Sequence, residues 1–373
     1  MRIGIDLLWV RVGKCGGTES YIRNLLDGFG RYDRSNEYIL LVSKDNGYSF
    51  ETYEQYSNMN RLVLPVESAS QPKRILWENL HLDRTARKLG IDVMFIPVYS
   101  MPVTYGSGIP YVCVIHDLQA LHYPQYFSAA RRLFLKNRWK HTCKAAAHIV
   151  ASSEYSKRDL QSHYPVSAPK CSVIYVPVET KASGLSAEVL KKKYGIDDNA
   201  YFYCVSSMLP HKNLKTLLEV MAFRKHRGDV TPLVLSGVGG GRDVFEEEVE
   251  KYGIQDMVID TGYVSDEERD CLYENCSLFL FPSMFEGFGM PPIEAMRKGK
   301  NVVTTECACM REVTEDKAVY VKEPRNVKEW VEKIDAAMKI PAQVWEFPNY
   351  DLQNITGQYL RVFESAKNMG IDR

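Results

Sequence analysis

Leu278-Phe279-Leu280-Phe281-Pro282-Ser283-Met284-Phe285-Glu286-Gly287-Phe288-Gly289-Met290-Pro291-Pro292-Ile293-Glu294 is the stretch of sequence that decides the fold. Its apolar start, 278–282, is typical of a strand buried on both faces. Two glycines follow, and prolines then open a helical pattern at 291–298, where the first turn favours proline. Gly299 marks the end of that helix. The stretch therefore predicts a buried strand, a glycine-bearing loop and a helix, the repeating unit of a doubly wound α/β sheet.

The loop of this unit carries the chemistry that points to function. We expect the backbone N–H groups of Phe288, Gly289 and Met290 to form an anion site with the dipole of the helix that follows. Glu286 in the loop and Glu294 on the helix lie eight residues apart. Carboxylates are poor phosphate ligands, but they accept hydrogen bonds from sugar and ribose hydroxyls. The loop therefore predicts a site for a phosphorylated sugar, and the alternative is an ordinary turn with solvent-facing acids.

Both halves of the chain repeat this alternation, which is typical of parallel sheets covered by helices on both faces. We expect one domain at 1–178, a linker at 179–199 within the Pro-, Gly-, Ser- and Lys-bearing stretch 176–199, a second domain at 200–348, and a helix at 349–373 packing back towards the first domain. Ligands of two such domains bind in a cleft at the carboxyl ends of the strands. The predicted strands are 2–8, 38–42, 93–97, 111–115, 147–151, 201–206, 233–236, 258–261, 278–282 and 301–305, and the predicted helices are 19–30, 76–89, 213–226, 291–298 and 352–369.

Composition excludes several classes of protein. The 373 residues are 45% hydrophobic and 25% charged, as in a globular protein and unlike a disordered chain or a disulfide scaffold. No apolar run reaches membrane-spanning length, and the N-terminus is unlike a signal peptide. Nine cysteines without a Cys-x-x-Cys pair predict reduced thiols and no metal site. The net charge is zero, which does not favour nucleic-acid binding, although residues 1–180 hold 22 basic and 16 acidic side chains and residues 181–373 hold 25 and 31.

Two further positions follow predicted strands. Lys212 comes between the strand 201–206 and the helix 213–226, where a mobile point charge suits a diphosphate, and a solvated surface lysine is the alternative. His116 ends the strand 111–115 beside Asp117, a place that a satisfied core histidine also takes. The glycines at 13–17 and 237–241 miss the spacing of a dinucleotide fingerprint, which argues against a nicotinamide dehydrogenase.

The order of these motifs resembles that of the retaining glycosyltransferases of family 4, whose fold is GT-B. The string 285–294 resembles the E-x7-E motif of that family and is its most specific sign. The remaining segments are similar to family segments in the same order: Gly16-Gly17-Thr18-Glu19 to the acceptor loop, 114–118 to the His-Asp segment, 149–157 to the Ser-x-x-Ser stretch, 209–213 to the phosphate-binding lysine segment and 261–264 to the turn that holds the nucleoside. The resemblance covers nearly the whole chain.

The resemblance implies a nucleotide-sugar donor in the C-terminal domain and an acceptor in the N-terminal domain. Glu294 then binds the ribose, Glu286 the sugar hydroxyls, and Lys212 with the loop amides the departing diphosphate. His116 hydrogen-bonds the transferring sugar, and Asp117 orients it or contacts the acceptor. The candidate catalytic residues are His116, Lys212 and Glu286; the donor-binding candidates are Ser207, Lys212, Asn213, Gly237, Tyr263, Val264, Glu286, Gly287, Phe288, Gly289, Met290 and Glu294; the acceptor-binding candidates are Gly16, Gly17, Thr18 and Asp117.

The sequence departs from the family at one position. Ser207 stands where many relatives carry an arginine that shares the diphosphate, so another group must neutralise the second phosphate. The chain has no Asp-x-Asp pair, and we therefore expect charge stabilisation by Lys212 and backbone amides with no required metal or other cofactor. A same-fold nucleotide-sugar epimerase and a non-catalytic nucleotide-sugar-binding protein remain as alternatives.

Location and substrate rest on weaker signals. Six basic residues and no acid occupy 131–144, interleaved with Leu133, Phe134, Leu135 and Trp139. A basic amphipathic helix suits the surface of an anionic membrane, and a sheet-covering helix with a solvated face is the alternative. The style of the Pro-His-Lys-Asn and His-Asp-Leu-Gln segments resembles bacterial enzymes of surface polysaccharide assembly. The resemblance thus favours a GDP-mannose donor, a glycan or lipid-linked acceptor, and a cytoplasmic protein at the inner face of the membrane, with acceptor, linkage and oligomeric state left open.

Overall fold

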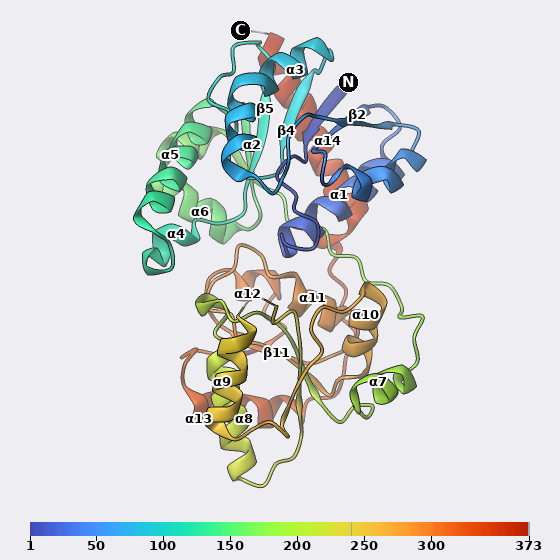
Figure 1. Cartoon of the computed structure of the whole chain (residues 1–373), viewed down its shortest axis with the longest axis vertical. Coiled ribbons are helices and arrows are strands. Elements are labelled where there is room, and N and C mark those ends of the chain that lie inside the picture. The colour runs from blue at the N-terminus through green and yellow to red at the C-terminus, as the bar shows by residue number, and fades with distance from the viewer. Residues whose placement is uncertain (240, 372–373) are drawn as a thin grey trace. The chain divides into compact units, whose positions relative to one another are not determined.

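The computed structural model describes residues 1–239 and 241–371, and the chain divides into two compact units (Figure 1). Unit 1 comprises Met1–Pro177 together with the chain from Pro348 onward, and unit 2 comprises Val178–Phe347. The C-terminal helix therefore belongs to the same unit as the N-terminal strand.

Unit 1 is built on a parallel sheet. Within the described residues its seven strands have the order β3-β2-β1-β4-β5-β6-β7. The central strands are buried along their whole length, which explains their continuous apolar sequences. The strands are β1 (Arg2–Asp6), β2 (Glu37–Val42), β3 (Met59–Val63), β4 (Val93–Ile96), β5 (Tyr111–Ile115), β6 (His148–Ala151) and β7 (Cys171–Val173).

Helices cover the sheet of unit 1. They are α1 (Gly17–Tyr32), α2 (Gln71–Trp77), α3 (Asp83–Lys88), α4 (Gln119–His122), α5 (Ala129–Ala145), α6 (Glu154–His163) and α14 (Leu352–Ile371). The single helix that we expected at 76–89 begins earlier, at Gln71, and a π-helical turn, Glu78–Leu82, separates its two α-helical parts. Pro72 in its first turn explains the earlier start.

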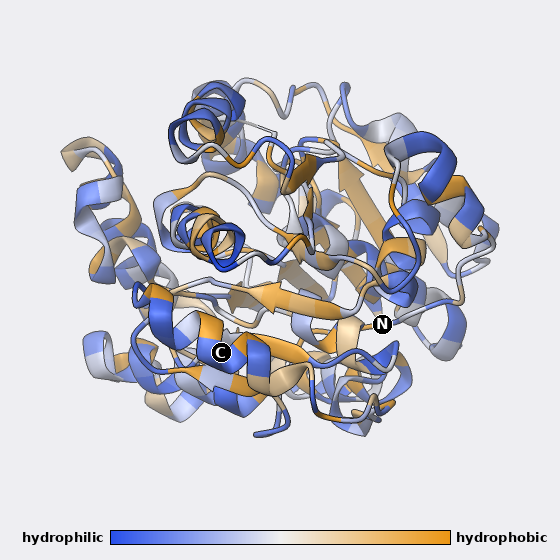
Figure 2. Cartoon of the chain, turned by 90° about the horizontal axis from the view of Figure 1, so that it is seen from below, coloured by the Kyte–Doolittle hydropathy of each residue, from blue (hydrophilic) through white to orange (hydrophobic). Residues whose placement is uncertain are grey.

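Unit 2 repeats the plan with the strand order β10-β9-β8-β11-β12-β13 among its described residues, again all parallel. Figure 2 shows hydrophobic strands and helices with hydrophilic outer faces. The strands are β8 (Phe202–Val205), β9 (Leu233–Ser236), β10 (Val258–Asp260), β11 (Leu278–Phe281), β12 (Val302–Thr305) and β13 (Val319–Val321). The helices are α7 (Ala187–Tyr194), α8 (Leu214–His226), α9 (Arg242–Tyr252), α10 (Asp266–Asn275), α11 (Met290–Arg297), α12 (Met310–Val313) and α13 (Val327–Ala337).

The doubly wound α/β prediction is confirmed for both units, but the sequence analysis did not predict three of the edge strands. β3, β7 and β13 are short and carry partly exposed residues. A strand at the edge of a sheet pairs on one side only and stays partly exposed, so polar residues interrupt β3 and β7, and β13 is only three residues long.

The stretch 179–199, which we expected to be a linker, is part of unit 2. It contains α7, whose Leu190 is buried, and α7 packs on α10. The thiol of Cys271 on α10 also lies 3.6 Å from the carbonyl oxygen of Leu185, just before α7. The Gly and Ser residues of this stretch lie in the turns around a helix, with Gly195 as the C-cap of α7.

One arginine joins the two ends of unit 2. Arg297 donates to the carbonyl oxygen of Val178 at 2.7 Å and to that of Phe347 at 2.8 Å. Val178 and Phe347 are the first and last residues of the unit. The chain therefore enters and leaves unit 2 at neighbouring points.

The C-terminal helix α14 completes the core of unit 1 by packing on α1, β4 and β5. Tyr359 and Phe363 stack around Phe29 and Phe95, with ring centroids 5.3–6.2 Å apart. The Tyr359 and Tyr21 hydroxyls are 2.6 Å apart. The aromatic contacts of Tyr359 and Phe363 hold the C-terminal helix against the first unit.

Gly28 of α1 permits the close approach of α14, and we expect Gly28→Ala to destabilise the protein by about 1–3 kcal/mol. A Cβ at this position would overlap Thr356 Oγ1 and lie 2.8 Å from Leu352 Cδ1. Urea unfolding measures the loss. Gly357→Ala on α14 is the matched control, because its Cβ meets only Arg361 Nη1, at 3.7 Å. Helix propensity makes that control neutral or stabilising, so equal losses in both variants would contradict the close-packing argument.

Candidate functional site

The candidate site of unit 2 lies at the point where the strand order of the sheet reverses. β8 and β11 are neighbours there, although they are far apart in sequence. Ligands of doubly wound sheets bind outside the carboxyl ends of such strands. The loop after β8 leads to Lys212, and the loop after β11 leads to Glu286.

Hydrogen bonds fasten these two loops to each other. The backbone N–H of Met284 donates to the carbonyl oxygen of His211 at 2.8 Å. Thr305, at the end of β12, donates through Oγ1 to the carbonyl oxygen of Ser283 at 2.5 Å. The buried thiol of Cys309 lies 3.3 Å from the Glu286 carbonyl oxygen and 3.2 Å from that of Phe288. The backbone that carries Glu286 is therefore supported from both sides.

The structure brings Lys212 and Glu286 together. Lys212 Nζ donates to Glu286 Oε1 at 2.6 Å. Their side chains are 25% and 15% exposed, so the pair is shielded from solvent but still reachable. An ammonium and a carboxylate side by side form a cation for a phosphate oxygen and an acceptor for hydroxyl groups.

The glycine-bearing loop passes into α11 through Gly289. Gly289 has a φ of 90°, a conformation that favours glycine, and a Cβ there would lie 2.6 Å from Met310 Cε. Phe288 and Met290 are buried on either side. Gly287 lies in the same loop, so the candidates Gly287–Met290 lead into the N-terminus of the helix that carries Glu294.

The other donor candidates occupy neighbouring loops. The N–H of Gly237 donates to the Gly262 carbonyl oxygen at 2.9 Å, next to Tyr263 and Val264. A Cβ on Gly237 would lie 3.4 Å from the carbonyl oxygen of Ser206, beside Ser207. The Gly237 loop thus lies between the Ser207 and Tyr263 segments, and the Tyr263 side chain is 75% exposed. Gly240 lies outside the described residues.

Asn213 has a supporting role in the structure. It is buried, it has a φ of 55°, and its Nδ2 donates to the carbonyl oxygen of Pro324 at 2.8 Å. Its Oδ1 accepts from Thr216 Oγ1, also at 2.8 Å. Both ends of its amide therefore contact protein, and the residue anchors the turn between Lys212 and α8.

Glu294 has its own partner on α10. Its Oε2 accepts a 2.8 Å hydrogen bond from the hydroxyl of Tyr273. Burial raises the pKa of Glu294, and Arg269 and the Tyr273 hydrogen bond act against that rise. Sequence reasoning missed both α10 residues. The capping box Ser265-x-x-Glu268 would have located the helix, and the spacing of four places Arg269 and Tyr273 on one face.

In unit 1, His116 follows β5 and has a lowered pKa. Its Nε2 lies 3.2 Å from the Pro97 carbonyl oxygen, and its ring meets Tyr21 edge-on at 4.9 Å. Burial lowers the pKa of His116 to about 4. The imidazole is therefore neutral at pH 7, and because a carbonyl only accepts, Nε2 carries the proton and Nδ1 is an acceptor. The Ser152 and Ser156 hydroxyls donate to the His116 carbonyl oxygen at 2.9 and 2.7 Å.

The remaining acceptor candidates lie at helix starts of unit 1. Asp117 Oδ1 accepts from the N–H of Gln119 at 2.9 Å, at the turn into α4. Gly16 precedes α1 with a φ of 53°, and Gly17 and Thr18 form its first turn. Glu19, the last residue of the string similar to the acceptor loop, accepts from the N–H of Gly13 at 2.9 Å and so ties the glycine-rich loop to α1.

Over the described residues, 1–239 and 241–371, the chain shows neither a metal-binding group of side chains nor a membrane-spanning helix. In that part of the chain, no three His, Cys, Asp or Glu side chains are grouped so that they could hold a metal ion. No helix there has both the length and the apolar composition needed to cross a membrane. The nine cysteines are free thiols, most of them buried.

The low pKa of His116 predicts its titration. We expect its ring resonances in an NMR titration to keep their neutral positions down to pH 5 and to move with a midpoint of about 4. A histidine of the unfolded chain titrates near 6.5, so between about pH 6.5 and 4 only the unfolded state binds the proton. His116 therefore lowers stability as the pH falls through this window. His116→Asn assigns the signal and removes the effect; a midpoint near 6.5 would contradict the burial argument.

Comparison with known proteins identifies related families for both halves of the chain. The family model of Glycosyltransferase Family 4 matches residues 15–182, and the model of Glycosyl transferases group 1 matches residues 186–351. Together the two matches extend over most of both units.

Curated relatives include mannosyltransferases. The chain is 28% identical over 239 residues to the O-antigen chain mannosyltransferase RfbU of Salmonella typhimurium, a match of 63% of each chain. It is 28% identical over 225 residues to the O-antigen chain mannosyltransferase B of Escherichia coli, 58% of each. The chain thus matches about three fifths of the length of these relatives. An uncharacterised glycosyltransferase of Methanocaldococcus jannaschii is 22% identical over 91% of this chain and 88% of its own.

Solved structures share the fold along the whole chain. Sucrose-phosphate synthase from Thermosynechococcus elongatus superposes with a TM-score of 0.73 at 16% identity, covering 100% of this chain and 98% of that one. HepE from Anabaena, solved in complex with UDP and glucose, gives 0.68 at 19% identity, with 100% and 99% coverage. At these identities the likeness shows the fold alone. With two α/β units of Rossmann type and both family models matched, the chain has the GT-B fold and belongs to family 4 of the glycosyltransferases.

Proposed function

We propose that the protein is a retaining glycosyltransferase that moves a hexose from a nucleotide-diphosphate sugar to a glycan or lipid-linked acceptor of a surface polysaccharide. The observation that carries the proposal is the Lys212–Glu286 pair at the carboxyl ends of β8 and β11. A sugar diphosphate needs one cation and one hydroxyl acceptor close together, and this pair offers both.

The two residues take different parts of the donor. When the donor binds, Lys212 leaves Glu286 and pairs with the diphosphate. It then stabilises the negative charge that builds on the diphosphate as the sugar departs. Glu286, released from Lys212, accepts hydrogen bonds from the sugar hydroxyls, while Glu294 binds the ribose. Lys212 and the backbone amides of 288–290 provide this stabilisation with no required cofactor.

The proposed roles in unit 1 concern the transferring sugar and the acceptor. Neutral His116 accepts a hydrogen bond from a sugar hydroxyl through Nδ1, a role that its low pKa permits at pH 7. Asp117 and the Gly16–Gly17–Thr18 turn contact the acceptor. No carboxylate is assigned as a covalent nucleophile, and retention of configuration proceeds by attack on the same face, assisted by the leaving phosphate.

The relatives favour a mannosyl donor. The names of RfbU and of the Escherichia coli protein describe O-antigen chain mannosyltransferases. This supports GDP-mannose and a role in lipopolysaccharide assembly in the cytoplasm. HepE, of the same fold, was solved with UDP-glucose, so a UDP-sugar is the second candidate donor.

Binding of nucleoside diphosphates tests the donor site. We expect one of GDP, UDP, ADP and dTDP, at 100 times its Kd, to stabilise the protein by about 2.7 kcal/mol, a rise of roughly 2–4 °C in Tm. Lys212→Ala and Glu294→Ala are expected to lose this rise. Lys215→Ala is the matched control, because Lys215 is a more exposed lysine on α8 that pairs with Glu248. A Tm that no nucleotide moves, or that NAD alone raises, would refute the proposal.

Turnover distinguishes the transferase from its alternatives. Incubation of the preferred labelled donor with and without a mannosylated acceptor separates transfer from epimerisation, which needs no acceptor. A binding protein leaves the donor intact in both tubes.

We also propose that the protein lies at the inner face of the membrane through residues 131–144 of α5. Leu133 is 62% exposed, and Lys136, Lys140 and Lys144 are exposed on the same helix. Arg131 and Arg138 instead lie over the ring of Phe134 at 5.5 and 5.2 Å. An exposed leucine beside exposed lysines suits a surface of anionic lipids.

Vesicle binding tests this surface. Full-length protein is expected to sediment with vesicles that contain 30% anionic lipid, and less so as salt rises, because the attraction is screened. The triple variant Lys136→Glu, Lys140→Glu and Lys144→Glu should stay in the supernatant. Charge reversal at Lys328, Lys333 and Lys339 in unit 2 is the control. Equal sedimentation of both variants would contradict the proposed surface.

A further inference from the structure

The carboxylate of Glu294 is held from a neighbouring helix by a rigid hydrogen-bond donor. Tyr273 of α10 donates to Glu294 Oε2 at 2.8 Å. The tyrosine is fully buried, its ring meets Tyr203 of β8 edge-on at 5.1 Å, and it packs on Phe279 of β11 at 5.2 Å. The hydroxyl therefore has a fixed position under the two strands that define the site.

Charges around Glu294 act in opposite directions on its ionisation. Burial raises its pKa, and Asp270 and Asp266 of α10 act in the same sense. Arg269 and the Tyr273 hydroxyl lower it. The Glu294 carboxylate in turn acts to raise the pKa of Arg269 and that of the buried Tyr203, so these groups are electrostatically linked. Arg269 and Tyr273 thus oppose the tendency of a buried carboxylate to take up a proton.

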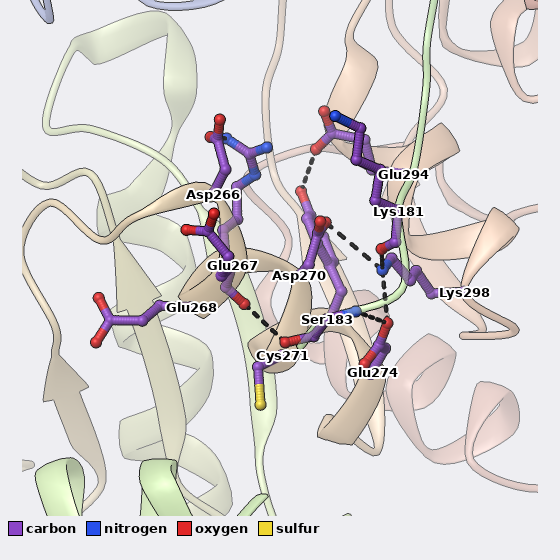
Figure 3. Close-up of polar contacts among 12 residues, drawn as sticks. Lys181, Ser183, Asp266, Glu267, Glu268, Asp270, Cys271, Glu274, Glu294 and Lys298 are labelled. Atoms are coloured by element: carbon purple, nitrogen blue, oxygen red, sulfur yellow. Dashed lines mark hydrogen bonds and ion pairs between the residues drawn. The ribbon is translucent and has the colours of Figure 1, made fainter. Parts of the chain in front are cut away.

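A second side chain fixes the distance between α10 and α11. Lys298 lies one helical turn after Glu294, and its Nζ donates to Glu274 Oε1 at 2.7 Å and lies 3.6 Å from Asp270 Oδ1. It also donates to the carbonyl oxygen of Lys181. Figure 3 shows Lys298 between these three partners, and a separate dashed line marks the hydrogen bond of Glu294. The Lys298 side chain is 6% exposed, so its contacts with these partners are shielded from water.

From this geometry we infer that Tyr273 is a positioning residue for the ribose of the donor: its hydroxyl holds Glu294 in one orientation, with the remaining acceptor sites of the carboxylate offered to the ribose hydroxyls. Arg269, one helical turn before Tyr273 on α10, supports it with a positive charge that favours the ionised carboxylate. The inference rests on the proposed function, which gives Glu294 the ribose. A carboxylate that is already oriented loses less conformational freedom when the ligand binds. Neither residue needs to touch the ligand.

Selectivity for the ribose hydroxyls is the direct readout. Calorimetric titration compares the nucleoside diphosphate that stabilises the wild type with its 2′,3′-dideoxy analogue. The wild type is expected to prefer the ribose form by tenfold or more, the effect of hydrogen bonds to a charged group. Tyr273→Phe is expected to weaken the ribose form about tenfold and to leave the dideoxy form unchanged, because only the former uses Glu294.

Tyr201→Phe is the matched control. Tyr201 is also fully buried in unit 2, and its hydroxyl donates at 2.8 Å to the carbonyl oxygen of Leu272, the residue before Tyr273. This variant loses a buried tyrosine hydrogen bond to the same helix but none to Glu294. It should lower Tm and keep the full preference for the ribose form, whereas a role of Tyr273 in stability alone would make the two variants behave alike.

Dependence on pH gives a second readout. Without the Tyr273 hydroxyl the pKa of Glu294 rises further, so as the pH is lowered the ribose preference of Tyr273→Phe should fall before that of the wild type does. Arg269→Met is expected to show the same trend. Arg269→Lys keeps the positive charge and is expected to behave like the wild type. Arg269→Met also serves as the test if Tyr273→Phe fails to fold.

The outcomes separate the inference from the proposed function. A wild type that binds a nucleoside diphosphate, with Tyr273→Phe and Arg269→Met keeping its ribose preference at every pH, overturns the positioning role and leaves the donor site intact. A wild type that binds no nucleotide overturns the proposed function and the inference with it. Loss of ribose preference in both variants, with the preference kept in Tyr201→Phe, supports the inference.

Discussion

The parallel pairing of β8 with β11 is the constraint on which the candidate site depends. It places two loops that are more than seventy residues apart in sequence at the same edge of one sheet. Without this pairing Lys212 and Glu286 have no reason to meet. The hydrogen bonds between the His211 and Met284 segments add to this order, because they fix the two loops after the sheet has brought them close.

Much of this arrangement follows from local sequence. The run 278–281 has no polar residue, so it is a central strand whatever surrounds it, and the prolines at 291 and 292 fix where the next helix starts. Lys212 and Glu286 were predictable for the same reason: each follows a strand that the sequence marks clearly. The family resemblance added their roles, and the matching family models agree with it.

Other parts were out of reach because they depend on tertiary contacts. α10 has a polar sequence, and its burial of Tyr273 against Tyr203 and Phe279 appears only once β8 and β11 are paired. The edge strand β13 has only three residues, Val319–Val321, and pairs with β12 alone, so its short apolar run does not stand out in the sequence. The segment 179–199 has the composition of a tether, and it becomes ordered because α10 and Lys298 give it partners. Sequence patterns report the local conformational preference of a residue. The positions of these residues are instead set by tertiary contacts with other parts of the chain.

The return of α14 to unit 1 has a consequence for biosynthesis. Phe29 and Phe95 are synthesised before unit 2, whereas Tyr359 and Phe363, which cover them, are synthesised after it. Unit 2 lies wholly between them, so it can fold as a continuous piece of chain while the first-made unit still waits for its final helix. Throughout that interval an aromatic surface of the nascent protein stays open to water and to chaperones.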